Sequence, residues 1–106
     1  MEKKDVFINR EKVLANLDTT ENYFINVFEN MDIDVGILRL RKGMTDTQVP
    51  HSIDEVYFVI EGEGHIEIEG KTKPVKSNDF IFIPANIKHK FVIGSKDLVV
   101  IYFFVS

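Results

Sequence analysis

From Tyr23 onward, short apolar stretches alternate with residues that favour turns. The stretches that predict strands cover residues 24–28, 33–40, 56–60, 65–69, 79–83, 90–93 and 98–105. Turn-forming residues separate them, namely Asn30, Gly43, Gly62, Gly70, Asn78, Pro84 and Gly94. Many short strands with frequent turn signals are typical of an all-β sandwich or barrel. The sequence therefore predicts a fold built of antiparallel strands.

Two features indicate how such a sheet is covered. Residues 98–105 are apolar throughout, so a strand there needs cover on both of its faces. Residues 10–17 place apolar side chains at 13, 14 and 17, which fits a short helical turn. We expect this helix or a second copy of the chain to supply the cover, and the second case predicts a homodimer. The predicted organisation is an N-terminal arm with a short helix over residues 1–22 and a β-barrel over residues 23–106.

Composition excludes several classes of protein. With 44% hydrophobic residues, the 106-residue chain can build one compact core. It has no cysteine, which excludes thiolate ligands and disulfides and fits a reducing cytoplasm. No apolar run approaches the roughly 20 residues of a membrane helix, and none resembles a signal peptide. A net charge of −4 with interspersed signs argues against nucleic acid, and residues 71–73 are interpreted as a solvated turn. We expect a cytoplasmic protein that binds neither membranes nor nucleic acid.

Two of the three histidines have neighbours that indicate metal chemistry. His51 and Glu55 are four residues apart, a spacing that can direct both side chains to one face of a strand. His89 lies where the chain enters a strand after the turn at Pro84. Two imidazoles and one carboxylate form a known ligand set that leaves coordination positions open. The third histidine, His65, lies in an alternating strand and is predicted to be on the surface.

The spacing around His51 resembles the first motif of the cupin family. That motif is Gly, five residues, His, one residue, His, three or four residues, Glu, six residues and Gly. In this chain Gly43, His51, Glu55 and Gly62 stand at matching places. Val49 stands where the family has its first histidine, and valine cannot coordinate a metal.

The region around His89 resembles the second cupin motif. That motif is Gly, five residues, Pro, one residue, Gly, two residues, His, three residues and Asn. Pro84 and His89 match it, while Asn78, Asn86 and Ile93 replace the other three positions. Asn tolerates left-handed backbone, so it is a mild change at the two turn glycines. The resemblance implies a single-domain cupin, an antiparallel double-sheet jelly roll or conical β-barrel.

The resemblance also implies a metal. One divalent transition ion, Fe, Mn, Zn, Ni or Cu, would be held by His51, Glu55 and His89, since these ligands suit any of the five. Gln48 is a candidate additional ligand through its amide oxygen, provided that a bulge turns it to the same face. A second interpretation keeps the same three residues as a buried hydrogen-bonded set without metal.

Six further residues are candidates for lining a pocket. Tyr57 shares parity with Glu55, and Phe91 shares parity with His89. The alternating pair Arg39 and Arg41 could hold an anion, or could form a solvated face. The full set is Val49, Tyr57, Phe82, Phe91, Arg39 and Arg41. Asp46 and Asp54 have the wrong parity relative to His51 and are interpreted as turn carboxylates.

Fold alone does not fix function, since cupins include dioxygenases, isomerases, sugar-binding domains and storage proteins. The leading hypothesis is a metal-binding cupin of dioxygenase (oxidoreductase) or isomerase type, acting on a small anionic or sugar-like molecule. The ion would then act as a Lewis acid or bind oxygen. The alternatives are a non-catalytic small-molecule or sugar sensor and a scaffold with a relict site.

Overall fold

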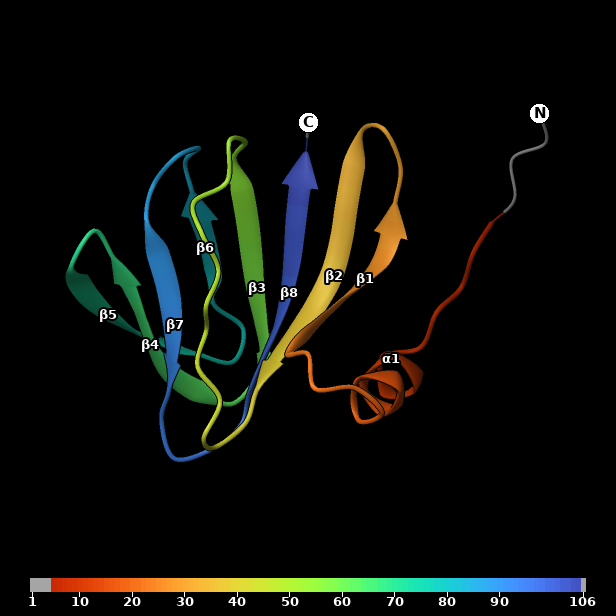
Figure 1. The fold of residues 1–106 in the computed structure, drawn as a ribbon, viewed down its shortest axis with the longest axis horizontal. Helices are drawn as coiled ribbons and strands as arrows, with labels where there is room; N and C mark the ends of the chain where they lie inside the picture. Colours follow the sequence, from red (N-terminus) through yellow and green to blue (C-terminus); the bar gives the residue numbers. More distant parts are fainter. Residues whose placement is uncertain (1–4, 106) are drawn as a thin grey trace.

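The computed structural model describes residues 5–105, which form eight strands in two antiparallel sheets and one short helix (Figure 1). The all-β prediction is therefore confirmed. The elements are α1 (Arg10–Leu17), β1 (Phe24–Glu29), β2 (Ile33–Leu40), β3 (Glu55–Glu61), β4 (Glu63–Ile68), β5 (Lys71–Lys76), β6 (Phe80–Ile83), β7 (His89–Ile93) and β8 (Leu98–Val105). Within this part of the chain, no helix is long and apolar enough to cross a membrane.

The core lies between the two sheets. The larger sheet has the strand order β1-β2-β8-β3-β6, and the smaller has the order β5-β4-β7. On the larger sheet Leu38, Val100 and Val59 are aligned across β2, β8 and β3. They belong to one buried cluster with Ile66 of β4 and Phe91 of β7. Alternation along each strand thus directs one apolar row into the space between the sheets.

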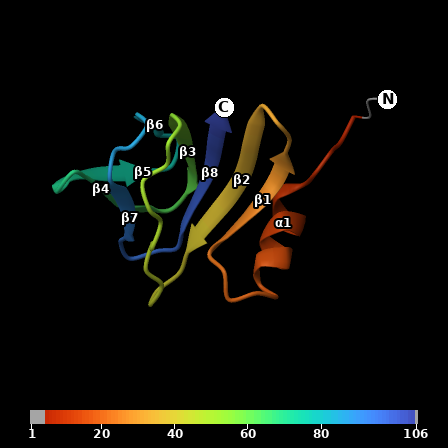
Figure 2. The same ribbon diagram turned by 45° about the horizontal axis from the view of Figure 1, so that its top comes forward.

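Helix α1 covers part of the outer face of the larger sheet, beside β1 (Figure 2). The helix begins after Asn9, whose side chain accepts a hydrogen bond from the backbone of Glu11 at 2.8 Å. Val13 packs there in a second buried cluster with Ile37 of β2 and Val99 of β8. The prediction that a helix supplies cover for residues 98–105 is confirmed for this part of the strand.

The rest of that outer face carries exposed aromatic side chains. Phe82 of β6 is aligned with Val56 of β3, which is aligned with Phe103 of β8. Phe80 and Phe82 remain 75% and 59% exposed. The suggestion that Phe82 lines a pocket is wrong, because strand alternation turns it outward while Ile83 faces the core.

Residues 71–76 form a strand, β5, where the sequence was interpreted as a solvated turn at 71–73. The turn is instead at Glu69 and Gly70, which have φ angles of 50° and 81°. Two consecutive positive φ angles suit a tight hairpin, and this one pairs β5 with β4 along its whole length. The lysines are indeed exposed, because β5 is an edge strand that buries Val75.

The two asparagines at the glycine positions of the second motif adopt left-handed backbone. Asn78 has φ 78° and Asn86 has φ 66°. The prediction that Asn serves at these turns is therefore confirmed, and both turns keep the shape that a glycine would allow.

Candidate functional site

Residues 41–54, between β2 and β3, run past β7 without regular secondary structure and bring the two motif regions together (Figure 1). The carbonyl oxygen of His51 accepts a hydrogen bond from the backbone N–H of Asn86 at 2.7 Å. The side chain of Asp54 accepts one from the backbone of Ala85 at 2.9 Å. These bonds fix His51 beside the turn that leads to His89.

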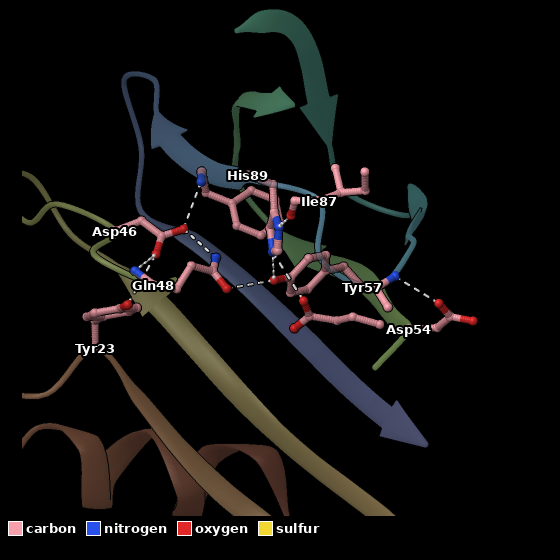
Figure 3. A network of polar contacts seen from close by, with 10 residues as sticks. Tyr23, Asp46, Gln48, Asp54, Tyr57, Ile87 and His89 are labelled. Atoms are coloured by element: carbon pink, nitrogen blue, oxygen red, sulfur yellow. Dashed lines mark hydrogen bonds and ion pairs between the residues drawn. The ribbon is translucent and has the colours of Figure 1, made fainter. Parts of the chain in front are cut away.

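Asp46 holds this segment in place from a buried position. Its carboxylate accepts hydrogen bonds from the backbone of Phe91 at 2.8 Å, from the amide of Gln48 at 2.6 Å and from the hydroxyl of Tyr23 at 3.1 Å (Figure 3). It is 4% exposed, so these donors replace the water it loses. Asp46 does act as a turn carboxylate, since it also accepts from the backbone N–H of Gln48 at 3.1 Å, but the parity argument missed its burial because it assumed a strand where the segment is irregular.

The polar contacts continue from Gln48 to His89 (Figure 3). The Tyr57 hydroxyl donates to the amide oxygen of Gln48 at 2.9 Å and lies 2.8 Å from Nε2 of His89. Burial, followed by the negative charge of Glu55, raises the pKa of Tyr57, so the hydroxyl keeps its proton. The carbonyl of Ile87 lies 2.8 Å from Nδ1, and since a carbonyl can only accept, Nδ1 carries a proton.

These contacts determine where the proton on the other ring nitrogen lies. The amide of Gln48 must donate to Asp46, so its oxygen faces Tyr57 and takes the hydroxyl proton. Nε2 of His89 then has to donate to the Tyr57 oxygen, which makes the ring an imidazolium. Burial opposes this charge on His89, but the contacts with Glu55 and Ile87 outweigh it and raise the pKa of the imidazole.

Glu55 is the counter-ion of this imidazole. Its Oε1 atom lies 3.1 Å from Nε2 of His89, and both side chains are at most 2% exposed. The contact is recorded as an ion pair, and Oε1 has no hydrogen-bond partner in the described part of the chain. Glu55 therefore has its charge compensated while part of its hydrogen-bonding capacity is unused.

The three predicted metal ligands are neighbours but do not converge. The His51 ring lies 4.5 Å from the Phe104 ring and 6.3 Å from the His89 ring, between centroids. Across residues 5–105, no three His, Asp or Glu side chains are grouped so that they could hold a metal ion. Nε2 of His89 is also engaged by Tyr57, and a metal ligand must be free of its proton. In this arrangement the residues do not fit a metal centre.

A cavity of about 360 Å³ opens beside His51 and Glu55. This volume lies in the range of small-molecule sites. Its walls combine aromatic rings with carboxylates and amides. The lining residues are Tyr23, Phe24, Asn26, Asp34, Leu38, Gln48, His51, Ser52, Ile53, Glu55, Tyr102 and Phe104. Gln48 reaches the cavity without a strand bulge, because its segment is not a strand.

Several candidate lining residues lie elsewhere. Arg39 and Arg41 both form ion pairs with Asp18, and neither lines the cavity. Of the two alternatives left open by the sequence, the anion site inside the barrel is wrong, since strand parity points Arg39 to the outer face beside α1. Val49 is 69% exposed and also lies outside the cavity lining, whereas Phe91 is in the core against Tyr57.

Sequence reasoning missed the residues that β1, β2 and β8 contribute to the cavity. Asn26, Asp34, Tyr102 and Phe104 lie on the inner face of the larger sheet. Their parity could have revealed them, because residues 34 and 38, like residues 102 and 104, share a face of their strand with core residues. What the sequence did not show was which predicted strands are neighbours.

The sequence model of the Cupin_2 family, described as a cupin domain, matches residues 36–105 of the chain. This chain belongs to that family. The cupin is also 32% identical over 94 residues to a Streptomyces coelicolor A3(2) protein described as "Uncharacterized protein SCO3923", an alignment that covers 89% of this chain and 90% of the other. The description of that protein names no activity.

Solved cupin structures show the same fold. A cupin protein from Bacteroides fragilis superposes with a TM-score of 0.70 at 18% identity, covering 82% of this chain and 79% of the other. The cupin 2 conserved barrel protein from Leptotrichia buccalis gives a TM-score of 0.71 at 22% identity, covering 82% of this chain and 43% of that one. The cupin fold predicted from the two motifs is thereby confirmed.

Proposed function

We propose that this cupin binds a small organic molecule in the cavity beside His51 and Glu55. The observation that carries the proposal is the composition of that cavity, whose lining combines the aromatic residues Phe24, Tyr102 and Phe104 with polar residues such as Gln48, His51 and Glu55. Apolar walls with a few convergent polar groups are typical of small-molecule sites. The network anchored on Asp46 holds one wall in place without a ligand.

A fragment screen tests this proposal. A library of small polar molecules is screened by ligand-observed NMR, and the contacts of each hit are mapped by amide chemical shifts. We expect hits that perturb residues lining the cavity and that lose binding in His51→Ala. The matched control is His65→Ala, which removes an exposed imidazole outside the cavity. Hits that all map to other surfaces, or that survive in His51→Ala, would refute the cavity as the binding site.

A metal-loaded form is the second candidate. The observation that favours it is the buried Oε1 of Glu55, which lacks a hydrogen bond and lies 3.1 Å from Nε2 of His89. Binding of a divalent transition ion by His51, Glu55 and His89 would require His51 to turn toward the other two. It would also require Tyr57 to release Nε2. Such a site would support the oxidoreductase or isomerase chemistry suggested by the family resemblance.

Elemental analysis separates the two candidates. Tag-free protein is purified without chelator, offered Fe, Mn, Zn, Ni and Cu in turn, and compared with His51→Ala and with His65→Ala. Near one ion per chain in the parent and in His65→Ala, with none in His51→Ala, supports the metal-loaded form. No uptake of any ion would exclude it and leave the metal-free binding cavity.

The exposed part of the larger sheet's outer face supports a homodimer. Phe80, Phe82 and Val105 are more than half exposed there, and a twofold axis would place this apolar surface against itself. We expect the parent to run as a dimer in light scattering coupled to gel filtration. The double variant Phe80→Ser, Phe82→Ser is expected to run as a folded monomer. A monomeric parent would refute the dimer.

A further inference from the structure

Strand register places two carboxylates on either side of an aromatic residue that lines the cavity. Asp34 of β2 is aligned with Phe104 of β8, and Phe104 is aligned with Glu55 of β3. All three line the cavity, so they share the inner face of the sheet. Neighbouring strands are about 4.8 Å apart, which puts the backbones of Asp34 and Glu55 roughly 10 Å from each other.

Of the two carboxylates that line the cavity, Glu55 has its charge compensated by His89, whereas Asp34 forms no ion pair within residues 5–105. Neither lysine nor arginine is among the lining residues within the described chain. Arg39, on the same strand as Asp34, points to the other face of the sheet and pairs with Asp18. An anionic ligand would therefore meet two carboxylates and no guanidinium or ammonium group, whereas a cation would find complementary charge.

Glu55 gives a second, independent observation, because one of its carboxylate oxygens lacks a hydrogen-bond donor. Its carboxylate is 2% exposed, it lines the cavity, and its buried Oε1 has no hydrogen-bond partner among residues 5–105. A buried carboxylate oxygen without a donor is costly, and an N–H group of a ligand would satisfy it once the Glu55 carboxylate turns toward the cavity that this residue lines. Its neighbour His89 compensates the charge but is itself committed to Tyr57 and Ile87.

The aromatic walls fit the rest of such a ligand. Phe24, Tyr102 and Phe104 line the cavity, and the rings of Tyr102 and Phe104 lie 5.6 Å apart between centroids. Ring faces attract cations and also contact hydrocarbon, so they suit an ammonium group attached to an apolar body. Burial and the charges of Asp34 and Glu55 raise the pKa of Tyr102, which keeps this wall uncharged.

We propose that the cavity selects an organic cation that has N–H donors on its charged group and an apolar body, with Asp34 as its charge partner and Glu55 as a hydrogen-bond acceptor. This inference rests on the proposed small-molecule function and names the chemical class of the ligand. It differs from the anionic molecule expected for a metal-loaded site.

Three molecules of nearly the same shape test the inference. Benzylammonium, benzyl alcohol and benzoate are titrated separately into isotope-labelled protein that has been treated with chelator, and amide shifts report affinity and location. We expect benzylammonium to bind in the cavity about tenfold more tightly than benzyl alcohol, the gain expected for a charged hydrogen bond. Benzoate is expected to bind more weakly than the alcohol.

Variants of one carboxylate identify its contribution. Asp34→Asn keeps the shape and removes the charge, and it is expected to reduce the preference for benzylammonium over benzyl alcohol several-fold. Asp97→Asn makes the same charge change at an exposed residue outside the cavity and is expected to leave the preference unchanged. An equal loss in both variants would show a general charge effect and would overturn the role of Asp34.

The outcomes distinguish this inference from the proposed function. If benzyl alcohol binds in the cavity as tightly as benzylammonium, the small-molecule function stands and the selection for cations is wrong. If benzoate binds most tightly, the charge assignment is reversed and the inference fails. If benzylammonium does not bind in the cavity, the inference also fails, and the fragment screen with His51→Ala then decides the proposed function independently.

Discussion

The two faces of the larger sheet carry similar apolar side chains but have different surroundings. The inner face packs against β4 and β7 in one part and opens into the cavity beside His51 in another. The outer face is covered by α1 beside β1 and β2, while Phe80 and Phe82 at the other edge stay exposed. Hydrophobicity alone therefore does not tell which side of a strand is buried, because burial depends on what packs against it.

The two faces also differ in how their carboxylates are compensated. Inside, Glu55 and Asp46 are buried, so each must be compensated by a donor or by charge. Outside, Asp18 pairs with Arg39 and Arg41 in contact with water, where such pairs contribute little. Four experiments can break or sharpen this difference between the faces.

The largest effect is expected from two substitutions at opposite ends and on opposite faces of β8. Leu98 is fully buried on the inner face, whereas Val105 is 63% exposed on the outer face. Leu98→Ala should lower the free energy of unfolding by about 2–5 kcal/mol, because it leaves a cavity in the core. Val105→Ala should change it by less than about 0.5 kcal/mol. Urea unfolding measures both, and comparable losses would show that the outer face is buried in solution.

The next largest effect is expected at Asp46, which anchors the irregular segment 41–54 against β7. Asp46→Asn should cost about 1–3 kcal/mol of unfolding free energy, since an amide cannot accept every hydrogen bond that this buried carboxylate accepts. Faster amide exchange at Phe91 should accompany the loss. The control Asp54→Asn removes charge from an exposed residue with one backbone partner and should cost less. Equal costs would argue against Asp46 as the anchor.

A third experiment tests how the inner face makes room for Tyr102. A Cβ atom at Gly36 would collide with the Tyr102 ring and lie 2.5 Å from the carbonyl oxygen of Ile25. Gly36→Ala should therefore cost about 1–3 kcal/mol through overpacking. Tyr102→Phe removes the hydrogen bond to Asn26 but keeps the ring, so it should cost about 1 kcal/mol. A neutral Gly36→Ala would show that the ring moves aside easily.

The smallest effect belongs to the outer face. The hydrogen bond from Arg39, with the charges of both arginines, lowers the pKa of Asp18. A lowered pKa in the folded state stabilises the fold above the unfolded value of about 3.9, and this contribution is lost as pH falls through the folded pKa. Thermal unfolding of the parent and Asp18→Asn should differ slightly at neutral pH and converge in acid. A difference independent of pH would contradict this explanation.

Much of the fold could be predicted from local sequence. The helix at residues 10–17, the strands at 33–40 and 98–105, and the left-handed turns at Asn78 and Asn86 all follow from residue pattern and backbone preference. The prediction at residues 71–73 failed because an edge strand of exposed lysines has the composition of a loop. Local pattern does not show pairing with β4, which is what makes this segment a strand.

The sequence by itself determined the family, the strand content and the two motifs, because these depend on spacing along the chain. In the first motif His51 is followed by Glu55, and in the second Pro84 is followed by His89. Tertiary structure alone decided the site. It brought Asp34, Phe104 and Glu55 into one row across three strands, buried Asp46 of the irregular segment 41–54 against β7, and joined Tyr57 to His89. The physical reason is that strand order and burial set which side chains meet and which lose water, and neither is encoded in local spacing.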